Sequence, residues 1–425
     1  MPNSLSQYFE EERNRVIEEC FLCGQCIREC PIIEHTDLKD YSSMEVQRKV
    51  IDFLTNGEKN DDVYIKAFAC MECYKCVKKH CPKGLNPLLI NEIIKWQYNL
   101  KGHAPIPYTD PKDQYAKQRV LASIQVSAED YKRIFMPTNK KSARYVFFPG
   151  CNVYLQPEKV LEALDIIDII GEDYAFVPGL DFCCGNVYLE AGVVEKGYNA
   201  SQELIDKLSS YNPETVIFWC PTCQCRFDMT VSKVSEMPFN IISYPQFLTV
   251  NVDKLPFNKN IDKTVTLHEA CKIAYMGLDI TSVREVLHKI PGVDLIEMSR
   301  HGENAACCGS SAMDFFENSM AVIRDERLQE AEETGADILV DICQTCHNIF
   351  AKEELKHTFE ITNYVSLIAE ALGIEREDKY KKYKQWGSLK RILEDAQEYI
   401  AQSEYPRDTI IEVLKNSIAS EESHE

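Results

Sequence analysis

Short apolar runs alternate with helical stripes over most of the chain. Four runs are rich in β-branched and aromatic residues, and one to three residues separate each from the next cysteine: YVFF (145–148), TVIF (215–218), TVTL (264–267) and DILV (337–340). Such short runs predict buried strands. Residues 193–208 and 319–333 carry helical patterns instead. This alternation predicts two α/β units with mainly parallel sheets, related by an approximate two-fold.

The N-terminal part of the chain carries a helical pattern alone. Residues 42–58 place apolar side chains on one helical face and begin with Ser42 and Glu45 at capping-box spacing. Asn86 and Pro87 have the N-cap and N1 identities of another helix. The sequence therefore predicts an all-α N-terminal domain rather than a β-rich one.

These patterns divide the chain into five parts. We expect a helical domain at residues 1–105, a linker rich in proline and polar residues at 106–142, two α/β units at 143–255 and 256–375, and a charge-rich helical tail at 376–425. The tail places Ile392, Leu393, Ala396 and Ile400 on one face. It is expected either to cap the repeated units or to dock a partner subunit.

Composition narrows the possible partners and the compartment. The chain has 425 residues and a formal charge of -20, which argues against nucleic acid as a partner because phosphate backbones demand clustered Lys and Arg. No signal peptide and no transmembrane segment of its own are expected. We expect the protein in the cytoplasm, or on the cytoplasmic face of a membrane through a partner. Its 19 cysteines then indicate metal ligation or redox chemistry rather than disulfides.

Two ferredoxin-type cysteine runs open the chain. The first places Cys20, Cys23, Cys26 and Cys30 before Pro31, and the second places Cys70, Cys73, Cys76 and Cys81 before Pro82 with one extra residue before the last cysteine. This spacing predicts two [4Fe-4S] cubanes, each taking one ligand from the other run. The expected sets are Cys20, Cys23, Cys26 with Cys81, and Cys70, Cys73, Cys76 with Cys30. Two structural zinc sites are the alternative, but these are normally built from CxxC pairs. His80 is expected to be a loop residue.

The α/β units repeat five cysteines each. The first has Cys151, Cys183, Cys184, Cys220 and Cys223, and the second has Cys271, Cys307, Cys308, Cys343 and Cys346, at offsets of 120, 124, 124, 123 and 123. Because the carboxyl ends of parallel strands bind ligands, each set is expected to converge on one site. Five thiolates are too many for a regular cubane. Gly185 and Gly309, after the cysteine pairs, are expected to let the backbone approach a cluster.

Alternatives remain open for these units. The CPTC and CQTC motifs are also typical of thioredoxin-like dithiols, and structural zinc is a further possibility. Cys225 has no counterpart in the second unit and is expected to be a buried spectator thiol. His268 and His347 lie beside predicted ligands, where a structural hydrogen bond is favoured over a proton-donating role. No histidine is expected to ligate iron.

The cysteine pattern of the two units resembles that of the Cys-Cys-Gly (CCG) domains of heterodisulfide reductases. The later gap of the second unit is one residue shorter than the family pattern, and the gap before Cys81 departs slightly from the ferredoxin pattern. With the helical ferredoxin domain in front, the order resembles that of the reductase D-subunit over residues of about 15 to 370. It is similar to iron–sulfur subunits of sulfate-reducer membrane complexes and of glycerol-3-phosphate, glycolate and lactate dehydrogenase systems.

The resemblance implies the cofactors and the chemistry. Each unit would hold a noncubane [4Fe-4S] cluster on its five cysteines, in addition to the two cubanes. Electrons would pass from the cubanes to these sites, which would reduce or form a disulfide within a larger redox complex. The alternative is an electron relay between a flavoprotein dehydrogenase and quinone or cytochrome. The implied partners are a flavoprotein or a membrane cytochrome b-type subunit and a thiol or disulfide substrate, since the chain has no flavin or nicotinamide fingerprint.

Overall fold

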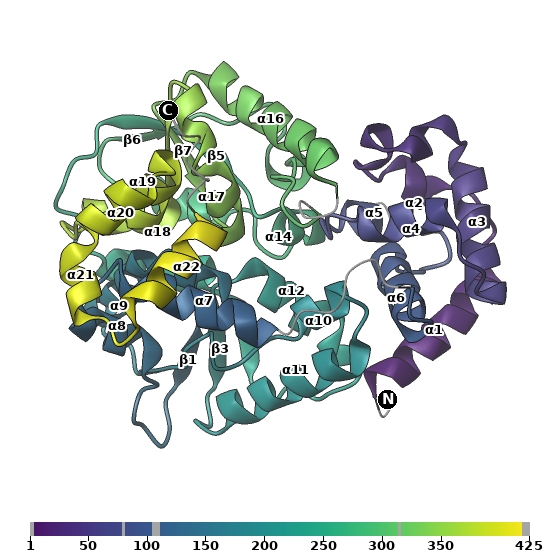
Figure 1. Cartoon of the computed structure of the whole chain (residues 1–425), viewed down its shortest axis with the longest axis horizontal. Coiled ribbons are helices and arrows are strands. Elements are labelled where there is room, and N and C mark those ends of the chain that lie inside the picture. The colour runs from purple at the N-terminus through teal and green to yellow at the C-terminus, as the bar shows by residue number, and fades with distance from the viewer. Residues whose placement is uncertain (1–3, 79–80, 104–110, 313–315, 419–425) are drawn as a thin grey trace.

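The computed structural model describes residues 4–78, 81–103, 111–312 and 316–418. A helical region lies at one end and two α/β units with a helical tail lie at the other (Figure 1). His80, expected in a loop, and the beginning of the expected linker are outside the described residues. None of the described helices is long and apolar enough to cross a membrane.

The N-terminal region is built from helices, as predicted. They are α1 (Leu5–Glu19), α2 (Gln25–Arg28), α3 (Ser43–Asn56), α4 (Asp61–Phe68), α5 (Lys75–Lys78) and α6 (Pro87–Leu100). The capping box between Ser42 and Glu45 is present at the start of α3, and Asn86 caps α6 with Pro87 in its first turn. Both helix starts are therefore confirmed, because each depends on residues that are neighbours in the chain.

The first α/β unit has a four-stranded parallel sheet in the order β2-β1-β3-β4. Its elements are β1 (Tyr145–Phe148), α9 (Pro157–Ile170), β2 (Tyr174–Phe176), α10 (Asn186–Glu190), α11 (Val194–Ser209), β3 (Thr215–Phe218), α12 (Pro221–Met229), β4 (Asn240–Ser243) and α13 (Tyr244–Val250). In this order the sheet grows outward on both sides of the β1–β3 pair. The carboxyl ends of those two strands thus meet at the place where such sheets bind ligands.

The second unit repeats this topology in the order β6-β5-β7-β8. Its elements are β5 (Lys263–His268), α14 (Cys271–Met276), α15 (Ser282–Leu287), β6 (Val293–Leu295), α16 (Glu317–Thr334), β7 (Ile338–Asp341), α17 (Gln344–Phe350), β8 (Glu360–Asn363) and α18 (Tyr364–Ala371). The fold class expected from the sequence, a helical region followed by two α/β units with parallel sheets, is confirmed.

One apolar core joins the two units. Helix α9 of the first packs against α18 of the second, while α13 of the first packs against α15 of the second. Since α9 corresponds to α15 and α13 to α18, the contacts are reciprocal, as an approximate two-fold requires. The shared core includes Ile167 and Leu248 from the first unit and Val286 and Ile368 from the second, all fully buried or nearly so.

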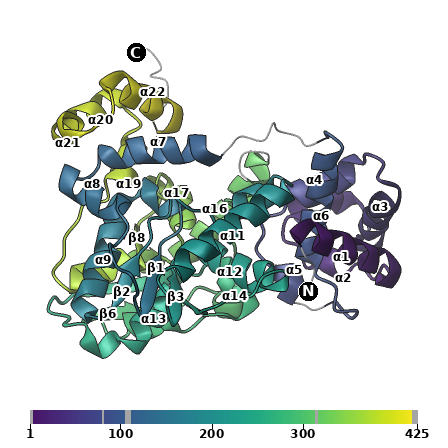
Figure 2. The same cartoon turned by 90° about the horizontal axis from the view of Figure 1, so that it is seen from below.

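The residues expected to form a linker hold two helices, and the tail packs against one of them. Helices α7 (Pro111–Ser123) and α8 (Ala128–Phe135) precede the first sheet, and α19 (Lys379–Trp386), α20 (Leu389–Asp395), α21 (Gln397–Gln402) and α22 (Arg407–Ser417) follow the second. Helix α22 lies beside α7 (Figure 2). Leu121 and Ile124 share a buried cluster with Ile410 and Leu414, so the tail covers this face of the molecule.

Candidate metal centres

The two ferredoxin-type runs adopt the same strained backbone. Leu22 and Glu72, each two residues after the first cysteine of its run, have φ of 61° and 50°. Gly24 and Tyr74, two residues further on, have φ of 70° and 68°. Left-handed backbone at non-glycine residues is costly and persists where the surrounding structure demands it. Left-handed residues thus occur at equivalent positions of the two runs, which indicates that both runs form the same type of ligand-binding loop.

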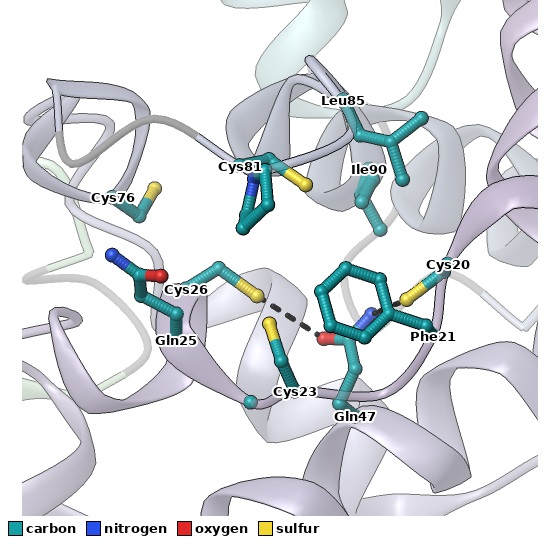
Figure 3. A pocket seen from close by; sticks show the side chains of 12 residues that line it. Cys20, Phe21, Cys23, Gln25, Cys26, Gln47, Cys76, Cys81, Leu85 and Ile90 are labelled. Atoms are coloured by element: carbon teal, nitrogen blue, oxygen red, sulfur yellow. Dashed lines mark hydrogen bonds between the residues drawn. The ribbon is translucent and has the colours of Figure 1, made fainter.

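The first run faces a pocket with about 440 Å³ of empty space. Five cysteines line it together with the apolar Phe21, Leu85 and Ile90: Cys20, Cys23, Cys26, Cys76 and Cys81 (Figure 3). Gln47 of α3 spans the site, because Cys26 Sγ donates to its Oε1 at 3.3 Å and its Nε2 donates to Cys20 Sγ at 3.5 Å. Burial raises the pKa of Cys26 to about 11. A thiol-lined, apolar pocket of this kind suits a cubane cluster.

The second run faces a neighbouring pocket of about 300 Å³ lined by Cys30, Cys70, Cys73 and Cys76. The buried Lys66 of α4 supplies a cation here and donates to Asn91 Oδ1 at 3.0 Å. Burial alone would lower the pKa of Lys66, but Cys30 and Cys70 more than offset this and hold it above its ordinary value. A buried ammonium beside four thiols fits the negative charge of a thiolate-bound cluster. Cys76 lines both pockets, and the ligand sets expected from spacing stay predictions.

In the first α/β unit, the five cysteines come together from three loops. Cys151 follows β1, Cys183 and Cys184 follow β2, and Cys220 and Cys223 follow β3. Burial, and then Cys220 and Cys184, raise the pKa of Cys151, while hydrogen bonds from Cys183 and Cys223 lower the pKa of Cys184. Each of the five thiols thus interacts with at least one other of the set, at the carboxyl ends of β1 and β3.

Tyr115 is a member of this first site that the sequence did not indicate. It lies on α7, in the stretch expected to be a linker, and is nearly buried. Burial, followed by the thiols of Cys151 and Cys183, raises the pKa of Tyr115. No motif surrounds this tyrosine, so only the packing of α7 over the sheet reveals it.

The second unit gathers its own five cysteines in the same way. Cys271 Sγ and Cys307 Sγ are 3.7 Å apart, and the Gly309 amide donates to Cys307 Sγ at 3.4 Å. Cys308 and Cys346 belong to a group with His268 whose ligand atoms all lie within 4.8 Å of one another. The thiols of Cys308 and then Cys343 raise the pKa of Cys346. All 19 cysteines of the chain are free thiols in the structure, so both sets are available to bind metal.

The glycines after the cysteine pairs have a packing role that the sequence did not indicate. Gly185 has φ of 86°, and a Cβ there would collide with the carbonyl oxygen of Gly197 and lie 2.6 Å from Ser201 Oγ. A Cβ on Gly309, with φ of 73°, would lie 2.5 Å from the Met320 carbonyl oxygen. The expectation that these glycines let the backbone approach a cluster stays a prediction. They admit the backbone of α11 and α16, which must pass close behind each cysteine pair.

His347 is committed to structural hydrogen bonds. Its Nδ1 lies 2.6 Å from Asp341 Oδ2 and its Nε2 lies 2.7 Å from Asp378 Oδ2. Burial and Lys159 would lower the pKa of His347, but the two aspartates hold it above its ordinary value. With both ring nitrogens occupied, His347 ties α17 to the start of α19 and leaves no nitrogen for the cysteines.

The second ferredoxin-type run packs directly against the second α/β unit. Helix α5 lies beside α14 (Figure 1), and Cys73 and Cys271 are close enough for the charge on Cys271 to affect Cys73. Lys272 Nζ lies 3.2 Å from Glu72 Oε2 across this junction. Cys225 is fully buried in the same apolar cluster, as a spectator thiol would be.

Comparison with known proteins agrees with this architecture. The cysteine-rich CCG domain matches residues 145–228 and 265–351, and a 4Fe-4S dicluster domain matches residues 16–85. The D-subunit of dihydromethanophenazine:CoB--CoM heterodisulfide reductase from Methanosarcina barkeri is 26% identical over 84% of this chain and 94% of its own length.

Two further relatives match smaller parts of the chain. The B-subunit of a fumarate reductase (CoM/CoB) from Methanothermobacter marburgensis is 23% identical over 77% of this chain and 66% of its own length. The C-subunit of anaerobic glycerol-3-phosphate dehydrogenase from Escherichia coli is 22% identical over 57% of this chain and 64% of its own length. The chain is therefore an iron–sulfur redox protein of the heterodisulfide reductase D-subunit type, in which a 4Fe-4S dicluster domain precedes two CCG domains.

Proposed function

We propose that this chain is the iron–sulfur subunit of a larger redox complex in which the two CCG units reduce or form a disulfide. The observation that supports this most directly is the junction at Cys73 and Cys271. It puts the ligands expected for the second cubane beside those expected for the second CCG cluster, so that electrons have a short path between them. Both CCG units also keep all five cysteines, as an active site requires.

The bound clusters would supply one-electron steps, whereas opening a disulfide consumes two electrons. Two clusters, one on the thiols of each CCG unit, could together supply both electrons. A pocket of about 420 Å³ lies between them, lined by residues from both units. Pro221, Ala270 and Ile342 in its wall each adjoin a cysteine of the proposed sets, namely Cys220, Cys271 and Cys343. Apolar side chains line the pocket together with the charged Glu269, Asp279 and Arg284. A concave pocket of mixed lining beside both sets suits a small thiol or disulfide with a polar group.

An electron relay is the second candidate function. The likeness to the C-subunit of an anaerobic glycerol-3-phosphate dehydrogenase favours it. In that case the CCG units would pass electrons between a flavoprotein and a membrane cytochrome or quinone, and no thiol would bind. Both functions need partner subunits that supply or accept electrons.

Metal content and thiol binding separate these functions. Anaerobically purified chain should contain about sixteen irons and a similar amount of sulfide if four [4Fe-4S] clusters are present, against about eight if only the cubanes form. The disulfide function further predicts a new EPR signal of the oxidised protein when candidate thiols are added. A full complement of iron with a spectrum that thiols do not change would favour the relay. Stoichiometric zinc with no sulfide would refute both.

A further inference from the structure

The two CCG units differ at the residue that ends their first central strand. In the second unit this is His268, and in the first it is Phe148, three residues before the first cysteine in each case. Both side chains are buried. Phe148 packs edge-on against Phe218 with ring centroids 5.7 Å apart, and it offers no polar atom. The second site therefore has a polar group that the first lacks.

Arg327 determines which nitrogen of His268 carries the proton. This fully buried arginine of α16 donates from Nε to His268 Nδ1 at 3.0 Å. It is held in place by Glu269 at 3.2 Å and Glu330 at 2.8 Å. A guanidinium can only donate hydrogen bonds, so Nδ1 must present its lone pair. The ring is then uncharged, with its proton on Nε2.

The Nε2–H group faces the cysteines. It is buried and has no nitrogen or oxygen partner among the residues that the structure describes. A ring nitrogen of His268 lies within 4.8 Å of the sulfurs of Cys308 and Cys346, and because Nδ1 is bound by Arg327, Nε2 is the nitrogen left for the cysteines. Phe350 packs against the ring at a centroid distance of 4.9 Å. A buried N–H group without an acceptor is costly, so the surroundings favour a sulfur acceptor on the cysteine side.

We infer that His268 is a hydrogen-bond donor to sulfur at the cluster of the second CCG unit, held in that role by Arg327, and that it is not an iron ligand. Iron ligation through Nε2 would require the proton on Nδ1, where the Arg327 contact forbids it. The inference rests on the proposed cluster in that unit. Hydrogen bonds to cluster sulfur stabilise the more negative, reduced state and raise the reduction potential. His268 would thus make the second unit, against which the second ferredoxin-type run packs through α5 and α14, the better electron acceptor.

His268→Phe provides the matched test, because it copies the residue of the first unit; it removes the Nε2–H donor together with the Nδ1 acceptor of Arg327. Iron content is measured first, since a wild-type chain without CCG iron would contradict the proposed function rather than this inference. Potentials of the CCG clusters are then followed by EPR during a redox titration. We expect one CCG cluster of His268→Phe to be harder to reduce by about tenfold in its reduced-to-oxidised ratio, which is 59 mV for one electron. The other clusters should not change.

Two further variants keep the inference falsifiable. His268→Gln retains an N–H donor and should recover part of the shift. Phe148→Leu alters the equivalent aromatic of the first unit and should leave the second cluster at its wild-type potential. An unchanged potential in His268→Phe would overturn the inference. So would loss of about four irons from that variant, or strong ¹⁴N coupling in the wild-type EPR spectrum, because either result would make His268 an iron ligand.

Discussion

Removing Arg226 should loosen the attachment of the dicluster domain to the first CCG unit. Arg226 of α12 is fully buried, and its Nη1 lies 2.8 Å from Glu92 Oε1 of α6. Its Nε and Nη2 also donate to Asn186 Oδ1 at 3.1 and 2.6 Å. Arg226→Met would leave Glu92 buried without its cation. Breaking a buried pair in this way costs about 3–5 kcal/mol.

Hydrogen exchange measured by mass spectrometry suits this test, because unfolding of a multidomain chain gives no single free energy. Amides of α6 and α12 should exchange about a hundred to several thousand times faster in Arg226→Met. The double variant Glu92→Met, Arg226→Met replaces the pair by apolar side chains and should recover most of the protection. Arg144→Met removes an exposed arginine paired with Glu172 and Glu214 and should have almost no effect.

The effect should also depend on pH with a defined sign. Burial raises the pKa of Glu92 above its ordinary value even with Arg226 present, and loss of the cation would raise it further. When the pKa of a carboxyl is higher in the folded state than in the unfolded state, the protein loses stability as pH increases. The Arg226→Met defect should therefore be smaller at pH 5 than at pH 8. A single-variant cost under about 1 kcal/mol, or a double variant as unprotected as the single, would refute the reasoning.

Three further predictions concern stability. Burial raises the pKa of Glu162 to about 8, so the stability of the wild-type protein should fall as pH rises from about 4.5 through 8. The Glu162→Gln variant should have the melting temperature of the wild type at pH 5 and a higher one at pH 8.5. Equal melting temperatures at pH 8.5 would contradict this prediction. Gly185→Ala should cost about 2 kcal/mol or more of local protection in α11, measured by hydrogen exchange. Gly171→Ala, where φ is 75° and no atom lies within 4 Å of the added Cβ, should cost about 1 kcal/mol of protection in α9, and equal costs would refute the role of the α11 contact. Leu414 is fully buried in the contact of α22 with α7, and Leu414→Ala should cost about 2–5 kcal/mol of protection against hydrogen exchange in both helices. The exposed Lys415→Ala serves as control. If the amides of Leu414→Ala exchange as slowly as those of the control, this contact does not hold the tail.

Much of the fold and of the metal chemistry was predictable because the signals are local. The helix start at Ser42 depends on residues within one turn, and strand β1 occupies the apolar run 145–148 that the pattern indicates. Cysteine spacing determines how many thiols one loop can direct to one point. The repeat offsets likewise required two units with the same topology, which the two sheet orders confirm.

The tertiary structure alone decided which other residues reach the candidate sites. Tyr115 comes from a stretch whose sequence is typical of a linker, and the backbone of α11 passes too close to Gly185 for any side chain. The proton position of His268 is set by Arg327, 59 residues away in the chain. Such contacts join side chains with no fixed spacing in sequence, so no periodic pattern or motif records them. They arise only when helices and sheets pack, because burial then forces each polar group to find a partner.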